Sequence, residues 1–373
     1  MTDDLQTITM PQWGLSMDEG MVVAWHVEEG ARIDAGDEIL DIETTKITNA
    51  LESPTSGVLR RRVVGEGETV PVGALLGVIA CGAIEETDVD AFIARFNEAF
   101  AVAAAAEAAG AVTEPEMVEA EGWRLSYQRA GQGDGAPLVL VHGYGGDLNS
   151  WLFNQPDLAP THMVYALDLP GHGRSSKDVR AGDLAALSGA LAAFLDALGI
   201  GRAHLTGHSL GGAVVLDLAL QHPDTVASLT LISSAGLGPE INKAFIDGFI
   251  AAGRRKEMKA VLELLFADPD SVSRDMVNEV LKYKRLDGVE TALRRIADAV
   301  FPGGRQGIVM ADKLSALSQP VQVVWGRQDR IIAPAHAESL PDNVAVAMID
   351  CVGHMPQMEA AAEINRLIRA ITV

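Results

Sequence analysis

Short apolar runs separated by turn-forming residues dominate the first part of the chain. From about Ile8 to Ala80, runs of strand length alternate with Gly, Pro and Asp. Short strands joined by turns produce this pattern, because each strand buries one face and each turn needs residues with unusual backbone angles. We therefore predict an all-β domain over residues 1–81.

This region also contains an internal repeat. A constant offset relates two sets of glycines: Gly20, Gly30 and Gly36, and Gly57, Gly67 and Gly73. Apolar Val27 and Val64 match at the same offset. Glycine reaches backbone angles that other residues avoid, so repeated glycines predict repeated turns and two similar halves.

Lys46 lies between the two halves of the repeat. Leu40 and Ile42 alternate with acidic residues before it, and Ile47 and Leu51 flank polar residues after it. This alternation predicts a strand on each side, with Lys46 at or near a hairpin tip where other proteins can reach its side chain. On position alone, an ordinary solvated lysine in a turn is the simpler interpretation.

The composition changes after residue 81. Apolar residues recur at helical spacing over residues 85–100, an Ala-rich run follows, and Pro115 then interrupts the pattern. We predict a partly helical, Ala-rich linker over residues 82–117, which would let the first domain travel. The pattern leaves open whether this helix binds a partner or packs on its own chain.

Strand-like and helix-like segments alternate through residues 118–373. The apolar strand-like runs are residues 138–141, 164–167, 203–206, 228–232, 321–325 and 345–349. This alternation predicts an α/β fold, in which a parallel sheet carries helices on both faces. Residues 239–317 instead show consecutive helical patterns, which predict a helical cap, or lid, inserted into the fold.

The segment Gly207-His208-Ser209-Leu210-Gly211 fits the pattern G-x-S-x-G and lies between a strand-like run and a helix start. In that context a tight turn lifts the serine hydroxyl out of the sheet, as in a nucleophile elbow. The motif alone also fits a serine in a Gly-rich turn. The strand, turn and helix around it favour Ser209 as a nucleophile.

A serine nucleophile needs a base, and an acid that orients the base. In this type of fold the acid and then the histidine follow the serine in sequence. Asp329 and His354 each come just after a predicted strand, at the sheet edge where ligands bind. Asp350 is the nearest rival acid, and Asp329 could instead cap a helix. We predict Ser209, Asp329 and His354 as the catalytic residues.

The glycine-rich loop after residues 138–141 can present backbone N–H groups to a developing oxyanion. We predict that the N–H groups of Tyr144 and Leu210 form this hole, because one donor usually comes from this loop and one from the residue after the nucleophile. We expect His142 and His172 to hold loops by hydrogen bonds, and His208 to fill the variable position of the elbow.

The overall charge restricts the kinds of partner. The chain has 51 acidic and 29 basic residues and a net charge of -22, which repels nucleic acids and anionic membranes. Its two cysteines, Cys81 and Cys351, suit a reducing cytoplasm. We find no signal peptide, no apolar run long enough to span a bilayer and no metal-binding motif, so we expect a cytoplasmic protein without a metal site.

Residues 118–373 resemble the α/β-hydrolase superfamily. The resemblance rests on the elbow motif and on the segments that contain His142, Asp168, Asp329 and His354, which read HG, DLPGHGRS, GRQD and GH. It implies the fold and the Ser-His-Asp triad but leaves the substrate open.

Residues 7–80 resemble the lipoyl domains of 2-oxo-acid dehydrogenase complexes. The matching positions are Met10-Pro11, Gly14, Met17, Glu19-Gly20, Glu43-Thr44-Thr45-Lys46 and Ser53-Pro54-Thr55-Ser56-Gly57. The resemblance implies a flattened β-barrel and lipoate that a lipoate-attaching enzyme joins to Lys46. Biotin-accepting domains share the fold but usually flank their lysine with methionines, whereas Thr45 and Ile47 flank Lys46. The family's commoner Asp-Lys-Ala is replaced here, which is a small departure.

The combination of the two domains is more specific than either domain alone. Ordinary acyltransferase subunits of these complexes carry a His-x-x-x-Asp-Gly motif, which this sequence lacks. A lipoyl domain fused to an α/β hydrolase resembles the acetyltransferase family of acetoin dehydrogenase complexes. The resemblance implies transfer of an acetyl group from lipoyl-lysine to coenzyme A. It also implies two partners, a thiamine-diphosphate-dependent acetoin-cleaving component and dihydrolipoamide dehydrogenase.

Two alternatives stay open at this point. Ser209 could hydrolyse an ester or thioester with water as the acceptor. The C-terminal half could instead be a non-catalytic scaffold that displays the lipoyl arm, although the intact order of Ser, Asp and His argues against this.

Overall fold

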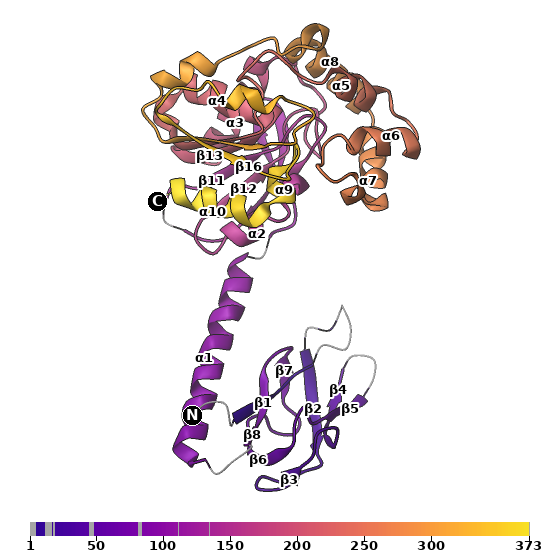
Figure 1. Ribbon diagram of the computed structural model, residues 1–373, viewed down its shortest axis with the longest axis vertical. Coiled ribbons are helices and arrows are strands. Elements are labelled where there is room, and N and C mark those ends of the chain that lie inside the picture. The colour runs from indigo at the N-terminus through magenta and orange to yellow at the C-terminus, as the bar shows by residue number, and fades with distance from the viewer. Residues whose placement is uncertain are drawn as a thin grey trace. The chain divides into compact units, whose positions relative to one another are not determined.

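The computed structural model describes residues 5–11, 17, 19–44, 48–80, 84–110, 112–133 and 135–372. The chain divides into two compact units, Met1–Ala108 and Ala109–Val373. Figure 1 shows a smaller unit of strands with one long helix, and a larger unit in which helices surround a sheet.

Two sheets form the N-terminal unit, with strand orders β1-β8-β6-β3 and β5-β4-β2-β7. The strands are β1 (Leu5–Thr9), β2 (Glu19–Trp25), β3 (Arg32–Ile33), β4 (Glu38–Glu43), β5 (Thr48–Glu52), β6 (Gly57–Arg62), β7 (Thr69–Pro71) and β8 (Leu75–Ala80). Buried side chains from both sheets, among them Val22, Leu40, Leu59 and Ile79, share one hydrophobic core. The predicted all-β domain is confirmed.

The repeat in the sequence corresponds to a repeat in the structure. β4 pairs with β2 in one half, and β8 pairs with β6 in the other. Each half also lends a short strand to the other, because β3 pairs with β6 and β7 pairs with β2. Gly30, Gly36, Gly67 and Gly73 all have φ between 83° and 91°, where glycine is favoured. The predicted repeat of turns is confirmed.

Helix α1 (Glu86–Gly110) packs on its own chain. Val89 is fully buried and clusters with Leu75 and Val78 of β8, and Phe92 packs against the same cluster. The first part of the helix therefore covers one face of the N-terminal unit. The limits of the linker, expected at residues 82–117, stay a prediction.

A long twisted sheet organises the C-terminal unit, in the order β16-β15-β14-β13-β11-β12-β10-β9. Its strands are β9 (Glu116–Ala120), β10 (Trp123–Ala130), β11 (Leu138–Val141), β12 (Val164–Leu167), β13 (Ala203–His208), β14 (Val226–Ile232), β15 (Val321–Gly326) and β16 (Val344–Ile349). The strands from β11 to β16 run parallel, whereas β9 and β10 add an antiparallel edge. The strands predicted from the apolar runs are confirmed, but the pattern did not predict β9 and β10.

Helices cover both faces of this sheet, as Figure 1 shows. α3 (Leu184–Ala197) and α4 (Leu210–Gln221) pack on one face, and α2 (Gln155–Leu158) and α10 (Ala361–Ile371) pack on the other. The buried residues of the two faces belong to separate hydrophobic clusters, because side chains along a strand point alternately to opposite sides. The predicted α/β fold is confirmed.

Between β14 and β15 the chain forms α5 (Lys243–Ala251), α6 (Arg255–Leu262), α7 (Arg274–Lys284) and α8 (Val289–Val300). These helices occupy the region where the cap was expected, residues 239–317. The Lys284 ammonium group, at the end of α7, donates to the carbonyl oxygens of Ile250 and Ala252 at 3.1 and 2.6 Å. This contact ties α7 to the end of α5. Within the described part of the chain, no helix combines the length and the apolar character needed to cross a membrane.

Candidate active site

Ser209 lies on a strained turn between β13 and α4. Its backbone angles are φ 53° and ψ −119°, a region that costs energy for any residue other than glycine. The turn is also too tight for side chains at its flanking glycines. A Cβ atom at Gly207 would lie 2.3 Å from the carbonyl oxygen of Gly211, and one at Gly211 would lie 2.3 Å from that of Val141. The residues around the motif therefore build the strained elbow that the sequence predicted.

The structure brings Ser209, His354 and Asp329 together. The Ser209 hydroxyl donates to His354 Nε2 at 3.0 Å, and His354 Nδ1 donates to Asp329 Oδ2 at 2.8 Å. All three residues are buried: Ser209 is 6% exposed, Asp329 8% and His354 2%. This burial keeps the chain of hydrogen bonds away from bulk water. The arrangement is the one in which a histidine can take the serine proton while a carboxylate holds its other nitrogen.

The rival acid, Asp350, is directed elsewhere. Its carboxylate forms an ion pair with Arg327 on the surface, with 2.8 Å between Oδ1 and Nε. After β14, at the other position where this fold could hold the acid, the chain carries Ser233 and Ser234. Among the described residues, Asp329 is thus the carboxylate bound to His354.

Two backbone N–H groups near the elbow come from Leu210 and from the loop of Tyr144. Leu210 begins α4, so its N–H has no partner within the helix. Gly143 approaches the elbow so closely that a Cβ atom there would lie 2.9 Å from Ser209 Cβ. Within the described part of the chain, the N–H groups of Tyr144 and Leu210 donate to no protein acceptor. Both are free to bind an oxyanion, and their role stays a prediction.

Two buried histidines hold the loop that carries Tyr144. His142 Nδ1 donates to the carbonyl of Gly143 at 2.8 Å, and its Nε2 accepts from the Leu169 N–H at 3.0 Å. His172 Nε2 accepts from the Gly145 N–H at 3.1 Å. Burial lowers the pKa of both histidines, so each keeps the neutral form that can accept a hydrogen bond. The expectation that they hold loops is confirmed.

His208 has a larger role than its variable motif position suggested. Its Nε2 donates to the carbonyl oxygen of His354 at 2.7 Å, and the two ring centroids are 4.9 Å apart. Burial lowers the pKa of His208 well below its usual value, so the ring stays neutral. The motif leaves this position variable. The contact of His208 with the His354 carbonyl forms only on folding, so the spacing of the motif could not predict it.

Glu359 holds the loop of His354 from the other side. Its carboxylate accepts from the N–H groups of Gly353 at 3.0 Å and Met355 at 3.3 Å, and from that of Ala267 in the cap at 2.7 Å. Burial raises the pKa of this carboxyl group. Glu359 was not among the predicted site residues, although an acidic residue so soon after His354 is a signal of such a contact.

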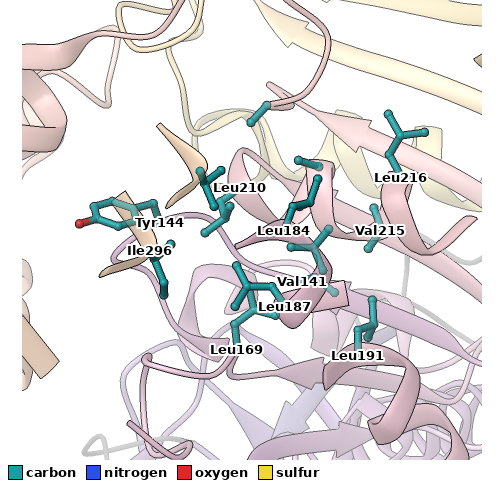
Figure 2. Close-up of a cluster of buried hydrophobic side chains, with 14 of the residues drawn as sticks. Val141, Tyr144, Leu169, Leu184, Leu187, Leu191, Leu210, Val215, Leu216 and Ile296 are labelled. Carbon is teal, nitrogen blue, oxygen red and sulfur yellow. The ribbon is translucent and has the colours of Figure 1, made fainter. Parts of the chain in front are cut away.

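The cap contacts both loops of the site. The Tyr144 hydroxyl donates to the carbonyl of Leu293 in α8 at 3.0 Å, and its ring packs against Phe249 of α5 at 5.9 Å between centroids. The His354 N–H donates to the carbonyl of Leu265 at 2.7 Å. Figure 2 shows Tyr144 and Leu210 in one buried cluster with core residues and with Ile296 of α8. Packing of the cap and core therefore fixes the loops that carry Tyr144 and His354.

Lys46 lies outside the described residues. On either side of it, β4 and β5 pair antiparallel, with Glu43 opposite Thr48. The strands predicted around Lys46 are therefore confirmed, and Lys46 belongs to the short connection between them. Among the residues that the structure describes, no three His, Cys, Asp or Glu side chains gather as a metal ion would require.

Two family models match the chain, one over each unit. Residues 6–79 match the family described as biotin-requiring enzymes. Residues 136–361 match the α/β hydrolase fold. These matches fall on the two-sheet unit and on the unit that contains the triad.

Solved structures share the fold of the larger unit. A meta-cleavage product hydrolase from Pseudomonas fluorescens IP01 superposes with a TM-score of 0.63 at 20% identity, over 69% of this chain and 96% of that protein. A bacterial membrane phospholipase A superposes with a TM-score of 0.62 at 24% identity, over 76% of this chain and 94% of that protein. Likenesses at this identity show the fold alone.

Relatives of similar length share both units. A Pseudomonas putida protein is 49% identical over 98% of both chains and is named dihydrolipoyllysine-residue acetyltransferase component of acetoin cleaving system. A Cupriavidus necator protein with the same name is 45% identical, over 97% of this chain and 96% of that one. The chain therefore belongs to the family of acetyltransferase components of acetoin cleaving systems, in which a lipoyl-type domain is joined to an α/β-hydrolase domain.

Proposed function

We propose that this chain moves an acetyl group from a lipoyl-lysine thioester at Lys46 to coenzyme A, using Ser209, His354 and Asp329. The observation that carries the proposal is the hydrogen-bonded Ser-His-Asp chain in a protein whose relatives are named acetyltransferases over their full length. The two-sheet domain around Lys46 supports lipoate as the carrier.

The N-terminal unit would supply the acyl carrier. Lipoate on Lys46 would provide a dithiol arm that holds acyl groups as thioesters. The connection that contains Lys46 joins two paired strands, β4 and β5, and a short hairpin of this kind leaves room for a modifying enzyme and for several active sites in turn. The flanking Thr45 and Ile47 favour lipoate over biotin.

In the first half-reaction, Ser209 attacks the carbonyl carbon of the thioester. His354 Nε2, 3.0 Å from the hydroxyl, takes its proton and then passes it to the departing sulfur. Asp329 stabilises the imidazolium cation through Nδ1. The N–H groups of Tyr144 and Leu210 stabilise the negative charge that forms on the carbonyl oxygen.

In the second half-reaction, His354 takes the proton of the coenzyme A thiol. The sulfur attacks the acyl-serine, the Ser209 oxygen leaves, and it regains the proton from His354. A transferase must keep water from the acyl-serine. The contacts of the cap with Tyr144 and His354, and the burial of Ser209, support this requirement.

The acyl group must reach the arm from another enzyme. We propose that a thiamine-diphosphate-dependent component cleaves acetoin and charges the arm in the cytoplasm, and that dihydrolipoamide dehydrogenase reoxidises it. Relatives named as components of an acetoin cleaving system support such a multienzyme arrangement.

The test uses full-length protein that is lipoylated on Lys46, reduced, acetylated on the arm and mixed with coenzyme A. We expect acetyl-coenzyme A as the main product, and its loss in Ser209→Ala, by about a thousandfold or more. Free acetate as the main product would support hydrolysis by water instead. Unchanged formation of acetyl-coenzyme A by Ser209→Ala would rule out the serine mechanism.

A further inference from the structure

Both oxygens of the Asp329 carboxylate accept two hydrogen bonds each. Oδ1 accepts from the N–H groups of Ile331 at 2.8 Å and Ile332 at 3.0 Å. Oδ2 accepts from His354 Nδ1 at 2.8 Å and from the indole N–H of Trp325 at 3.0 Å. A carboxylate offers roughly four acceptor positions, so the four donors occupy all of them.

Of the two side chains that donate to Asp329 Oδ2, Trp325 has no role in the proposed reaction. It lies in β15, its side chain is fully buried, and its N–H binds the same oxygen as His354. The indole N–H also reaches the carbonyl oxygen of Ile332, at the longer distance of 3.3 Å. Two donors on one oxygen share its negative charge, so each holds that oxygen less strongly than it would alone.

We propose that Trp325 is a positioning residue that limits the basicity of His354 through Asp329. The inference rests on the proposed function, because it assumes that Asp329 and His354 act as acid and base. By withdrawing charge from Oδ2, the indole N–H makes the imidazolium form of His354 less stable. His354 then stays neutral, and able to take a proton from Ser209 or a thiol, down to a lower pH.

A second buried tryptophan shows that this contact is not a general need of the fold. Trp151 is also fully buried, yet in the described part of the chain its indole N–H has no acceptor. The fold therefore tolerates a buried tryptophan whose N–H donates to nothing. The N–H of Trp325, by contrast, is directed at the catalytic carboxylate.

The other titratable groups around the pair stay the same in the test. His208 contacts His354 from the elbow, and Glu359 holds its loop from α9 (Pro356–Glu359). Behind Trp325, the ring of His336 packs edge-on at 6.2 Å and pairs with Glu240 at 2.8 Å. Arg330 donates to the carbonyl oxygens of residues 263 and 266 in the cap. These groups are unchanged in every variant at residue 325.

The test compares Trp325→Phe with Trp151→Phe in the full-length protein. The acylation step is followed as kcat/KM for p-nitrophenyl acetate across the acid limb of the pH profile. In Trp325→Phe we expect the acid limb of the profile to shift to higher pH by about half a pH unit or more. We also expect kcat/KM at the optimal pH to fall by about threefold to tenfold. Trp151→Phe should keep the pH profile of the unaltered protein.

Loss of the Trp325 N–H has two effects, and both shift the acid limb to higher pH. Without the indole N–H, Oδ2 binds the imidazolium more strongly, which raises the pKa of His354. The carboxylate itself also becomes easier to protonate. Both effects inactivate the triad at a higher pH, so a downward shift or no shift contradicts the inference.

An isosteric replacement guards against a variant that does not fold. Benzothienylalanine at position 325 keeps the shape of tryptophan and replaces the N–H with sulfur, and the same replacement at 151 is its control. The same upward shift at 325 alone supports the inference. Equal profiles at 325 and 151 overturn it and leave Trp325 a packing residue. Ser209→Ala in the same assay separates the two proposals, because ester turnover that persists there would contradict the triad itself.

Discussion

The two units organise their chemistry in opposite ways. In the proposed function, the N-terminal unit acts through one lysine in the connection between the paired strands β4 and β5. The C-terminal unit instead would act through residues far apart in sequence, since 145 positions separate Ser209 from the hydrogen-bonded His354. A local site can be lost without harm to its fold. A site assembled from distant segments depends on the packing of every element that holds it.

Lys46→Arg gives the largest expected effect. It removes the amine that lipoate needs but keeps the charge, so it should reduce lipoate-dependent formation of acetyl-coenzyme A by about a thousandfold or more, while hydrolysis of p-nitrophenyl acetate stays unchanged. Both activities are measured on the same preparation. Loss of both would show that the two units do not act separately.

A mixture of Lys46→Arg and Ser209→Ala sharpens this comparison. Each variant retains the group that the other lacks. Recovery of transfer in the mixture would show that the arm of one molecule serves the triad of another. If the mixture stays inactive, each arm serves only its own chain.

Acid should destabilise the C-terminal unit more than the N-terminal unit. Burial lowers the pKa of His142, His172 and His208, so the folded unit resists protons that the unfolded chain accepts. The stability that these groups contribute is present above their unfolded pKa of about 6.5 and is lost as the pH falls toward their folded values. At pH 5 the loss is at most about 2 kcal/mol for each histidine.

The N-terminal unit provides the internal control for this pH effect. Its histidine, His26, is partly exposed, and its Nε2 lies 3.0 Å from the Asp41 carboxylate. Calorimetry of the full chain at pH 8 and pH 5 should show a larger drop in the melting temperature of the C-terminal unit. Equal drops in both units would show that the buried histidines do not control the response to acid.

Val89→Asp should act on the N-terminal unit alone. Val89 is fully buried between α1 and the β8 side of the barrel, so an aspartate there would leave an unpaired buried charge or detach the helix. We expect a loss of about 3–5 kcal/mol in the stability of this unit. The matched control is Ala94→Asp, at an exposed position of the same helix. A fall in ester hydrolysis with Val89→Asp would contradict the independence of the two units.

Features fixed by local pattern were predictable from the sequence. The glycines of the repeat, the apolar strands and the elbow motif each reflect a backbone requirement within a few residues, as the φ values of Gly30 and Gly67 illustrate. The order of serine, acid and histidine then identified Asp329 and His354, because strand ends meet at one edge of a parallel sheet.

Contacts between segments that are distant in sequence were not predictable. The edge strands β9 and β10 mix charged and polar residues with short apolar stretches, a pattern that resembles a surface segment. Nothing near Trp325 in sequence shows that its N–H reaches Asp329, and nothing near Glu359 shows that it holds the N–H of Ala267. Such contacts join segments that only folding brings together.

Tyr144→Phe gives the smallest expected effect and tests how the cap supports the site. The Tyr144 hydroxyl donates to the carbonyl of Leu293, and burial raises its pKa, so it stays protonated. Removing this hydrogen bond should cost about 1 kcal/mol, or about 2–4 °C in the melting temperature of the C-terminal unit. The rate should change little, because His172 holds the neighbouring Gly145 N–H and the elbow contacts Gly143. A hundredfold fall in rate without a change in melting temperature would mean that the hydroxyl, rather than the backbone N–H of Tyr144, takes part in the chemistry.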